Sequence, residues 1–583
     1  MPGGQLDNLI PLHARLNEWQ LAGWTPTRVA DSGLGCRLEA DMRIPMADGV
    51  HLSADVYMPR RDGRYPVVLA FSAYNRDLHT AGVPTGTNEI GSPPIIASRG
   101  YVHVIVNARG TGCSEGTLQP WHCKAEVDDH QRCVEWAAAQ PWCNGDVCLF
   151  GTSYYGMNQP EIAARQLPML KAFFCNEICT DFRRHLFRYG GVFNADFLSL
   201  WLGANFTPEA MHRRMSPLKR ALLSYVINRP WVWRLMRSRI DRIMQGFKKN
   251  RPTFEALRYF MALLADDDKG LPQPFWEGPY QELHRIEIPF VVVQNRGLIA
   301  LHQFGAYDLF AHAGTMPGKR HLIIGPAEYT LPVYSWQLEA LAFFDHVVKG
   351  LDNGYDKLAR VRYWRDGANE WGSADDIPPT DANTQRLYLH AGGLLAPEIP
   401  ASGTAHWLSV PRGTPVPPGV EPQELTYEWS VADDLELLGP VTLNLRFACN
   451  EIDSYVVARL DCIGRTGDAR LIAMGHLRPA RRRIDNVASG RNEIAIDLRT
   501  VDPLVPNMPV SLRFSLTPAA AAIKAGDTLR LRIASRTDLF RPRVQDGFIA
   551  PDMAVPPYFA RNTIFFGSDT TLDLSVRGKH WVR

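Results

Sequence analysis

The hexapeptide Gly151-Thr152-Ser153-Tyr154-Tyr155-Gly156 contains the residue best suited to covalent chemistry in this chain. It follows the apolar run 147–150, which predicts a buried strand, and precedes 157–164, which predicts the opening of a helix. Ser153 is therefore expected on a tight strand-to-helix turn, where small residues relieve crowding and the hydroxyl is presented as a nucleophile. The spacing is G-x-S-x-x-G rather than the usual G-x-S-x-G, and glycine-flanked serines also occur in ordinary turns.

The elements expected to position Ser153 are those of an α/β domain. The short β-branched runs 66–71 and 102–106 predict interior strands, and 126–139 predicts a helix packed on their sheet. A helix-rich insertion then separates this part from a further apolar run at 288–293. This alternation is typical of a parallel sheet covered by helices.

The C-terminal part of the chain has a different pattern. After the linker-like segment 375–380, short runs alternate apolar and polar residues, as antiparallel strands with one buried face do. The clearest runs are 386–390, 441–447, 455–460 and 528–533. They predict a β-sandwich.

Several further motifs accompany the serine in a fixed order. In sequence they are Ile44-Pro45-Met46-Ala47-Asp48-Gly49-Val50, Asn107-Ala108-Arg109-Gly110-Thr111-Gly112, Gln140-Pro141-Trp142-Cys143-Asn144-Gly145, Gly325-Pro326 and Asp352-Asn353-Gly354. With the G-x-S-Y-x-G elbow, this set resembles the cocaine-esterase-like and X-Pro dipeptidyl-peptidase group of serine hydrolases. The resemblance implies an α/β-hydrolase domain at 1–179 and 286–370, a helical cap at 180–285 and a jelly-roll-like β-sandwich at 371–583.

The resemblance also implies the partners that a catalytic serine needs. A serine hydroxyl is a weak nucleophile until a base within hydrogen-bond reach activates it and a third group orients the base. Aligning the family's motifs puts Leu298 where the aspartate belongs and Tyr329 where the histidine belongs. Leucine accepts no hydrogen bond, and tyrosine is a poor base at pH 7. The sequence therefore predicts a degenerate triad.

Other groups could complete the site. The family likeness assigns the Tyr74 hydroxyl and the backbone N–H of Tyr154 to an oxyanion hole. His302 and Glu328 are the candidate substitute bases, although each also has a plain structural interpretation. We therefore keep two hypotheses. The first is hydrolysis of an ester, thioester or amide through Ser153. The second is a non-hydrolytic enzyme, or a ligand-binding pseudo-hydrolase, that reuses the same pocket.

Composition limits the partners. The 583 residues carry a formal net charge of +2, which gives no overall reason to expect nucleic acid. No signal peptide or transmembrane segment is recognisable, and ten scattered cysteines without paired motifs fit reduced thiols in the cytoplasm. We expect no cofactor and no metal. The basic segment 213–251 fits a solvated face of the cap; as a functional element it fits an anionic small-molecule substrate better than a membrane surface. The sequence leaves a homo-oligomer open.

Overall fold

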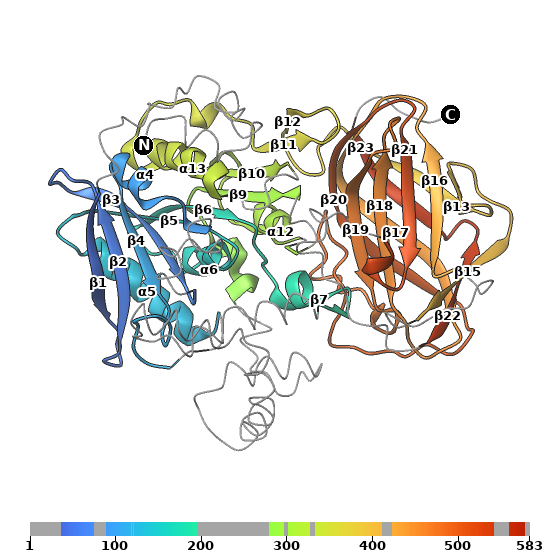
Figure 1. The fold of residues 1–583 in the computed structure, drawn as a ribbon, viewed down its shortest axis with the longest axis horizontal. Helices are drawn as coiled ribbons and strands as arrows, with labels where there is room; N and C mark the ends of the chain where they lie inside the picture. Colours follow the sequence, from blue (N-terminus) through green and yellow to red (C-terminus); the bar gives the residue numbers. More distant parts are fainter. Residues whose placement is uncertain are drawn as a thin grey trace, which may run out of the picture.

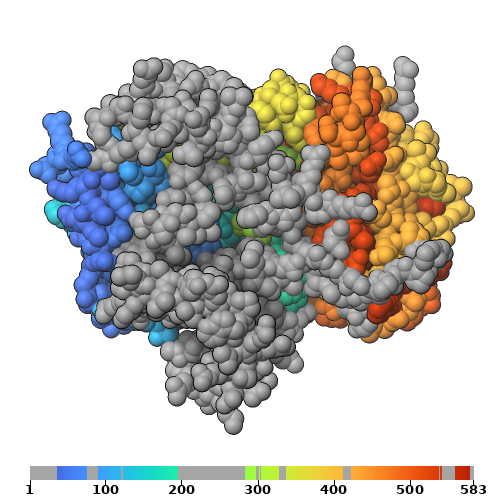
Figure 2. All heavy atoms as spheres, viewed as in Figure 1, coloured from blue at the N-terminus to red at the C-terminus, as the bar shows by residue number. Residues whose placement is uncertain are grey.

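The computed structural model describes residues 36–74, 89–117, 119, 122–194, 279–296, 301–302, 304–326, 333–410, 422–540 and 559–577. They form two large β-sheets that lie side by side, one N-terminal and one C-terminal (Figure 1). The space-filling view places the first strands and the C-terminal strands at opposite ends of the molecule (Figure 2). Within the described ranges, no helix has the length and apolar character needed to cross a membrane.

The N-terminal sheet has ten strands in the order β1-β2-β4-β3-β5-β6-β9-β10-β11-β12. All pairings from β4 to β11 are parallel, whereas β1, β2 and β12 pair antiparallel at the two edges. The strands are β1 (Arg37–Pro45), β2 (His51–Met58), β3 (Tyr65–Ser72), β4 (Val102–Asn107), β5 (Cys143–Thr152), β6 (Leu170–Asn176), β9 (Phe290–Asn295), β10 (Arg320–Gly325), β11 (Val361–Arg365) and β12 (Glu370–Ala374). The predicted strands at 66–71, 102–106 and 147–150 are confirmed.

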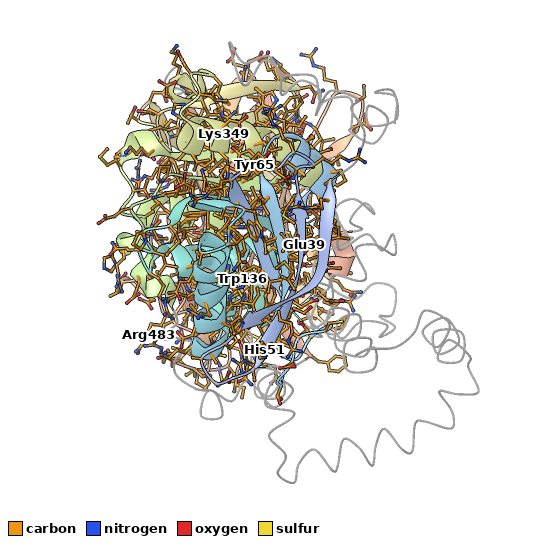
Figure 3. All side chains as sticks on the ribbon, turned by 90° about the vertical axis from the view of Figure 1, so that its left-hand side faces the viewer. Glu39, His51, Tyr65, Trp136, Lys349 and Arg483 are labelled. Carbon is orange, nitrogen blue, oxygen red and sulfur yellow. The ribbon has the colours of Figure 1, made fainter. Side chains whose placement is uncertain are left out.

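Helices cover both faces of this sheet. They are α4 (Pro93–Ser98), α5 (Lys124–Ala138), α6 (Tyr154–Ala163), α12 (Gly305–His312) and α13 (Val333–Lys349). Apolar residues of α5, α6 and α12 share one core with Val67 and Leu69 of β3, and those of α4 and α13 share another with Val68. Neighbouring strand residues point to opposite faces, so the two cores lie on opposite sides of the sheet. Figure 3 shows α5 with Trp136 beside the strands and Lys349 of α13 well apart from it.

The C-terminal sheet has eleven strands around a core of its own. Its path runs β15-β22-β17-β23-β13-β14-β16-β21-β18-β19, and β20 pairs with β17. The strands are β13 (Ala382–His390), β14 (Leu394–Ala396), β15 (Gly403–Ser409), β16 (Glu424–Ser430), β17 (Leu435–Cys449), β18 (Val456–Ile463), β19 (Ala469–Leu477), β20 (Val510–Ile523), β21 (Thr528–Ala534), β22 (Ala560–Phe566) and β23 (Thr571–Arg577). The four runs predicted as strands in this half are confirmed.

Strand β20 joins the two halves. It lies on the side of the C-terminal domain that faces the first sheet (Figure 1). Ala519 and Ala521 are buried in the C-terminal core, while Ala520 between them is buried in the N-terminal core together with Leu438 and Ile377. Methyl side chains let the strand approach a second core closely, which gives the short alanine run a structural reason.

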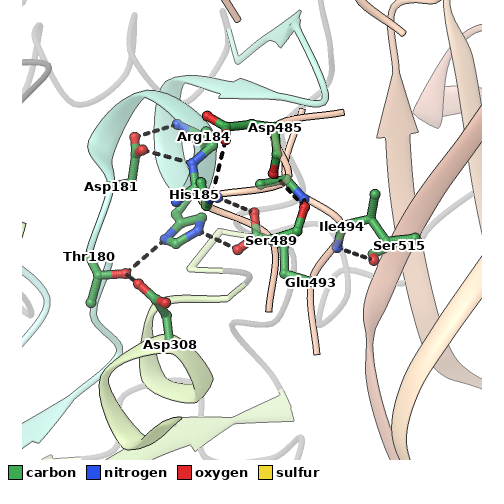
Figure 4. A network of polar contacts seen from close by, with 12 residues as sticks. Thr180, Asp181, Arg184, His185, Asp308, Asp485, Ser489, Glu493, Ile494 and Ser515 are labelled. Atoms are coloured by element: carbon green, nitrogen blue, oxygen red, sulfur yellow. Dashed lines mark hydrogen bonds and ion pairs between the residues drawn. The ribbon is translucent and has the colours of Figure 1, made fainter. Parts of the chain in front are cut away.

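A polar network crosses the same boundary (Figure 4). It begins on a single helical turn, η2 (Arg183–Phe187), in the segment that follows β6. Arg184 Nη1 and His185 Nε2 each lie 2.9 Å from one oxygen of Glu493 in the C-terminal domain. Asp181 accepts a hydrogen bond of 2.7 Å from Arg184 Nε. Glu493 thus holds two neighbouring side chains of the other domain at once.

Candidate active site

Ser153 occupies the sharp turn between β5 and α6. Its backbone has φ 55° and ψ −120°, a strained conformation that residues other than glycine rarely adopt. The Ser153 N–H donates to the carbonyl of Asn176 at the end of β6, at 2.9 Å. The helix was expected to open at Met157, but α6 begins at Tyr154, because the chain turns into the helix directly after the serine. The geometry is that of a nucleophile elbow.

The glycines of the hexapeptide are required by close backbone contacts. A Cβ on Gly156 would lie 2.8 Å from Asn176 O and 3.0 Å from Gly151 O, and a Cβ on Gly151 would lie 2.4 Å from Tyr155 Cβ. The second glycine therefore stands three residues after Ser153, at the point where the first turn of α6 passes the end of β6. This packing accounts for the G-x-S-x-x-G spacing.

His302 lies next to the serine. Its Nε2 is 3.5 Å from Ser153 Oγ, and its side chain is buried. It stands between β9 and α12, where Gly305 allows a close approach: a Cβ on Gly305 would lie 2.2 Å from Ile178 O. The segment that carries His302 is thereby packed against the segment that follows β6.

Glu177 lies behind this imidazole. It is fully buried directly after β6, and its Oε2 is 3.7 Å from His302 Nδ1. Its carboxylate accepts hydrogen bonds from Gln294 Nε2 at 2.8 Å, from Asn295 Nδ2 at 2.7 Å and from the Asn295 backbone N–H. These donors offset the cost of burying a carboxylate and fix its direction.

Ser153, His302 and Glu177 therefore form a chain with the order of a serine triad. The His302–Glu177 separation is longer than a hydrogen bond, and Nδ1 has no hydrogen-bond partner among the described residues. A shift of about half an ångström at each contact would bring both into range, and such tightening commonly accompanies substrate binding. An Nδ1–H directed at Glu177 leaves the Nε2 lone pair facing the serine, which is the tautomer that a general base requires.

The expected oxyanion side lies at the same turn. Tyr154 is the first residue of α6, and the N–H after a nucleophile is a usual oxyanion donor. The ring of Tyr74 packs 5.6 Å from that of Tyr154 and 5.8 Å from that of Tyr155. Its backbone is held on both sides, because Tyr74 N donates to Ser72 Oγ and Asn107 Nδ2 donates to Tyr74 O. The structure thus brings the rings of Tyr74 and Tyr154 together, and Tyr154 directly follows Ser153.

The other predicted site residues, Leu298, Glu328 and Tyr329, lie outside the described residues, as does the basic segment 213–251. The sequence interpretation missed Glu177. One signal could have found it: a carboxylate directly after a buried strand, since the carboxyl ends of neighbouring parallel strands meet at one edge of a sheet. In the part of the chain that the structure describes, no group of three or more His, Cys, Asp or Glu residues could hold a metal ion.

A cleft of about 740 Å³ opens between the two domains. It is lined by residues 180–184, by part of α12 and by the C-terminal loop 485–499. Ser153, His302 and Glu177 are not among its lining residues, so this cleft is separate from the chain that these three residues form.

Comparisons with known proteins identify relatives of both domains. A sequence profile of the X-Pro dipeptidyl-peptidase (S15) family matches residues 48–330, and one of the X-Pro dipeptidyl-peptidase C-terminal non-catalytic domain matches 353–545. A candidate serine esterase of Mycobacterium bovis is 26% identical over 579 residues, which cover 84% of this chain and 89% of that protein. Cocaine esterase of Rhodococcus sp. is 25% identical over 484 residues, which cover 75% and 81%.

A solved structure shows the same fold. The CocE/NonD family hydrolase of Staphylococcus aureus superposes with a TM-score of 0.74 at 21% identity, over 95% of this chain and 98% of that one. Its likeness extends through the helix-covered sheet and the strand-rich C-terminal domain. With both of its domains matched in this way, the chain belongs to the X-Pro dipeptidyl-peptidase and cocaine-esterase family, with an α/β-hydrolase fold and an all-β C-terminal domain.

Proposed function

We propose that this protein is a serine hydrolase that cleaves an ester, thioester or amide of a small molecule, with Ser153 as nucleophile, His302 as general base and Glu177 as the group that orients the base. The observation that carries the proposal is the 3.5 Å separation between Ser153 Oγ and His302 Nε2, with Glu177 behind the imidazole. A degenerate triad was expected from positions 298 and 329; a partner pair from other positions supports catalysis all the same.

The proposed triad is displaced across the sheet. In the family pattern the acid position, 298, follows β9 and the base position, 329, follows β10. Here Glu177 follows β6 and His302 follows β9, so each partner stands one strand nearer to the nucleophile. Strands β5, β6 and β9 are successive neighbours, and their carboxyl ends meet at one edge. Geometry and role, not sequence position, define a triad.

The reaction follows from these positions. Ser153 Oγ forms a bond to the acyl carbon while its proton passes to His302 Nε2, and the carbonyl oxygen takes the negative charge. The Tyr154 N–H and the Tyr74 hydroxyl are proposed to stabilise that oxyanion. Collapse breaks the bond to the leaving group, which takes the proton from His302. Water then attacks the acyl-serine, again through His302, and releases the acid and free Ser153.

The proposal is tested with an activity-based probe. A fluorophosphonate should label wild-type protein at Ser153 and leave S153A unlabelled, and H302Q should be labelled far more slowly. The rate of p-nitrophenyl ester hydrolysis should likewise be lower in H302Q than in wild type and lowest in S153A. Absence of labelling in folded wild-type protein, together with a small molecule bound beside Tyr74, would favour the non-hydrolytic or ligand-binding alternative.

Two further points belong to the proposal. All ten cysteines are free, which supports a reducing compartment and hence the cytoplasm. The anionic character of the substrate rests on the basic segment 213–251, outside the described residues.

A further inference from the structure

We infer that Glu126 is a positioning residue for the acyl-transfer step. It accepts a hydrogen bond from the Tyr154 hydroxyl and so holds the first turn of α6 in place. In that way it sets the direction of the Tyr154 backbone N–H, next to Ser153. The inference rests on the proposed hydrolase function, because the N–H matters only if an oxyanion forms there.

The contact joins the start of one helix to the start of another. Tyr154, the first residue of α6, is 4% exposed, and its hydroxyl donates a hydrogen bond to Glu126 Oε1. Glu126 stands in the first turn of α5 and is 6% exposed. Its second oxygen accepts the backbone N–H of His122 at 3.1 Å. The carboxylate is therefore held from two sides before it holds Tyr154.

A second contact ties the same loop to the far part of α6. His122 Nδ1 lies 2.8 Å from Glu161 Oε1, and both side chains are buried. The His122 ring packs 5.0 Å from the Tyr154 ring and 4.3 Å from Phe182, in the segment after β6 that begins with Glu177. Helix α6 is thus fixed at two points by one polar cluster, which also touches the segment that carries the proposed catalytic acid.

Burying the polar groups of this cluster costs free energy, so the cluster is a poor way to stabilise the fold. It buries two carboxylates around one imidazole, and replacing such groups by apolar side chains is often neutral or stabilising. Apolar residues at both 154 and 126 would fill the same space without a buried donor and acceptor. What the hydroxyl and carboxylate add is direction, because a hydrogen bond constrains Tyr154 in a way that packing alone does not.

The cluster also makes the position of Tyr154 depend on protonation. Burial raises the pKa of Glu126 to about 7. Burial alone would lower the pKa of His122, but the carboxylate of Glu161 raises it above its usual value. Burial likewise raises the pKa of Tyr154, which keeps its hydroxyl a donor. When Glu126 takes up a proton, one of its two oxygens becomes a hydroxyl, and the carboxyl loses the charge that strengthens its hydrogen bonds from Tyr154 and from the His122 N–H.

The titratable groups that face Glu126 or its partners His122 and Tyr154 come from four segments. They are His122 and Cys123 on the preceding loop, His130 on α5, Tyr154 and Glu161 on α6, and Tyr74 after β3. The ionised state of Glu126 accepts from both Tyr154 and the His122 N–H through two charged oxygens, which makes both hydrogen bonds stronger than those of the neutral carboxyl. Catalysis should therefore gain from ionisation of Glu126 as the pH rises through about 7, in addition to any gain from the base.

The test compares E126Q, Y154F and the double variant E126Q/Y154F in ester hydrolysis from pH 5.5 to 9. If Glu126 acts through Tyr154, each single variant lowers kcat about tenfold with KM nearly unchanged, and the double variant is no worse than either. The rising limb near pH 7 should become shallower in all three. D128N, on the exposed side of the same helix, is the matched control and should behave as wild type.

The outcomes separate this inference from the proposed function. If S153A and H302Q abolish hydrolysis while Y154F keeps wild-type kcat and pH profile, the positioning role of Glu126 is overturned and the hydrolase survives. Additive losses in the double variant would also overturn it. If S153A remains active, the function itself fails. Should E126Q unfold, which its melting temperature shows, Y154F decides alone, because it retains the packing of the ring.

Discussion

The carboxylate of Glu177 faces the imidazole of His302, with 3.7 Å between Oε2 and Nδ1, although 125 residues separate them in sequence. Both are buried, and Gln294 and Asn295 from the strand before His302 hold the carboxylate in place. Strand β9 therefore supplies the side chains that hold the carboxylate and also leads into the segment that carries the imidazole.

Replacing Glu177 by glutamine should disable the base. The amide keeps the shape but removes the charge that stabilises the imidazolium and selects its tautomer, so kcat should fall by about 10³-fold with little change in KM. Steady-state hydrolysis of a p-nitrophenyl ester measures this. E287Q, at an exposed position just before β9, is the control. A nearly active E177Q would show that His302 works without an acid.

Replacing Gly305 by alanine should move His302 away from the serine. The added Cβ would meet Ile178 O at 2.2 Å, so the start of α12 must shift outward. Overpacking of this kind costs about 1–3 kcal/mol, and we expect a lower melting temperature together with slower fluorophosphonate labelling. G318A is the control, because nothing lies within 4 Å of its added Cβ. Unchanged labelling in G305A would mean that the loop before α12 absorbs the shift.

Three buried histidines should each favour unfolding as the pH falls from 6.5 to about 4. Burial lowers the pKa of His130 and of His476 to about 3, and that of His321 to about 4. Below pH 6.5 the unfolded chain binds protons at these histidines while the folded chain does not, so stability falls as the pH falls. Each group contributes about 1.4 kcal/mol per pH unit in this window.

The variant H130F tests this pH dependence. His130 stacks on Phe71 at 4.6 Å, so phenylalanine preserves the contact and removes the titration. Its melting temperature should fall less between pH 6.5 and 4.5 than that of wild type. H284F, at an exposed histidine, should keep the wild-type slope. Equal slopes in H130F and wild type would contradict the expected proton uptake at His130.

Replacing Glu493 by glutamine should weaken the joint between the domains. Arg184 and His185 both contact this half-buried carboxylate across the boundary, and an amide in its place keeps the shape but not the charge that strengthens these two contacts. We expect calorimetry of E493Q to resolve two unfolding transitions, whereas the wild type should show a single one. E370Q, on the exposed edge strand β12, is the control. An unaltered thermogram would show that apolar contacts alone couple the domains.

The fold was predictable from the sequence because its signals are local. Apolar runs such as 102–106 are buried on both faces of the sheet, and such strands are near-continuously hydrophobic. The start of α6 was less accessible, because Ser153 turns the chain within one residue and the helical pattern becomes visible only later. Element ends depend on such single-residue geometry.

The site was only half predictable. Ser153 has a motif around it, and His302 could be named as a candidate because it is near the expected acid position. Glu177 has no motif, and its role depends on β6 lying between β5 and β9, which is a property of the folded sheet. Motif spacing predicts partner residues at fixed positions in the sequence. The carboxylate that lies beside the His302 imidazole is instead determined by which strands are neighbours in the folded sheet.

The alternating burial of Ala519, Ala520 and Ala521 has a consequence for how the enzyme opens to its substrate. One strand contributes to two cores, so swinging the C-terminal domain away would expose Ala520, Leu438 and Ile377 to water. A hinge at this boundary is therefore unfavourable. We expect the C-terminal domain and the first sheet to move as one body, so a swing of the C-terminal domain is not the motion that admits a substrate.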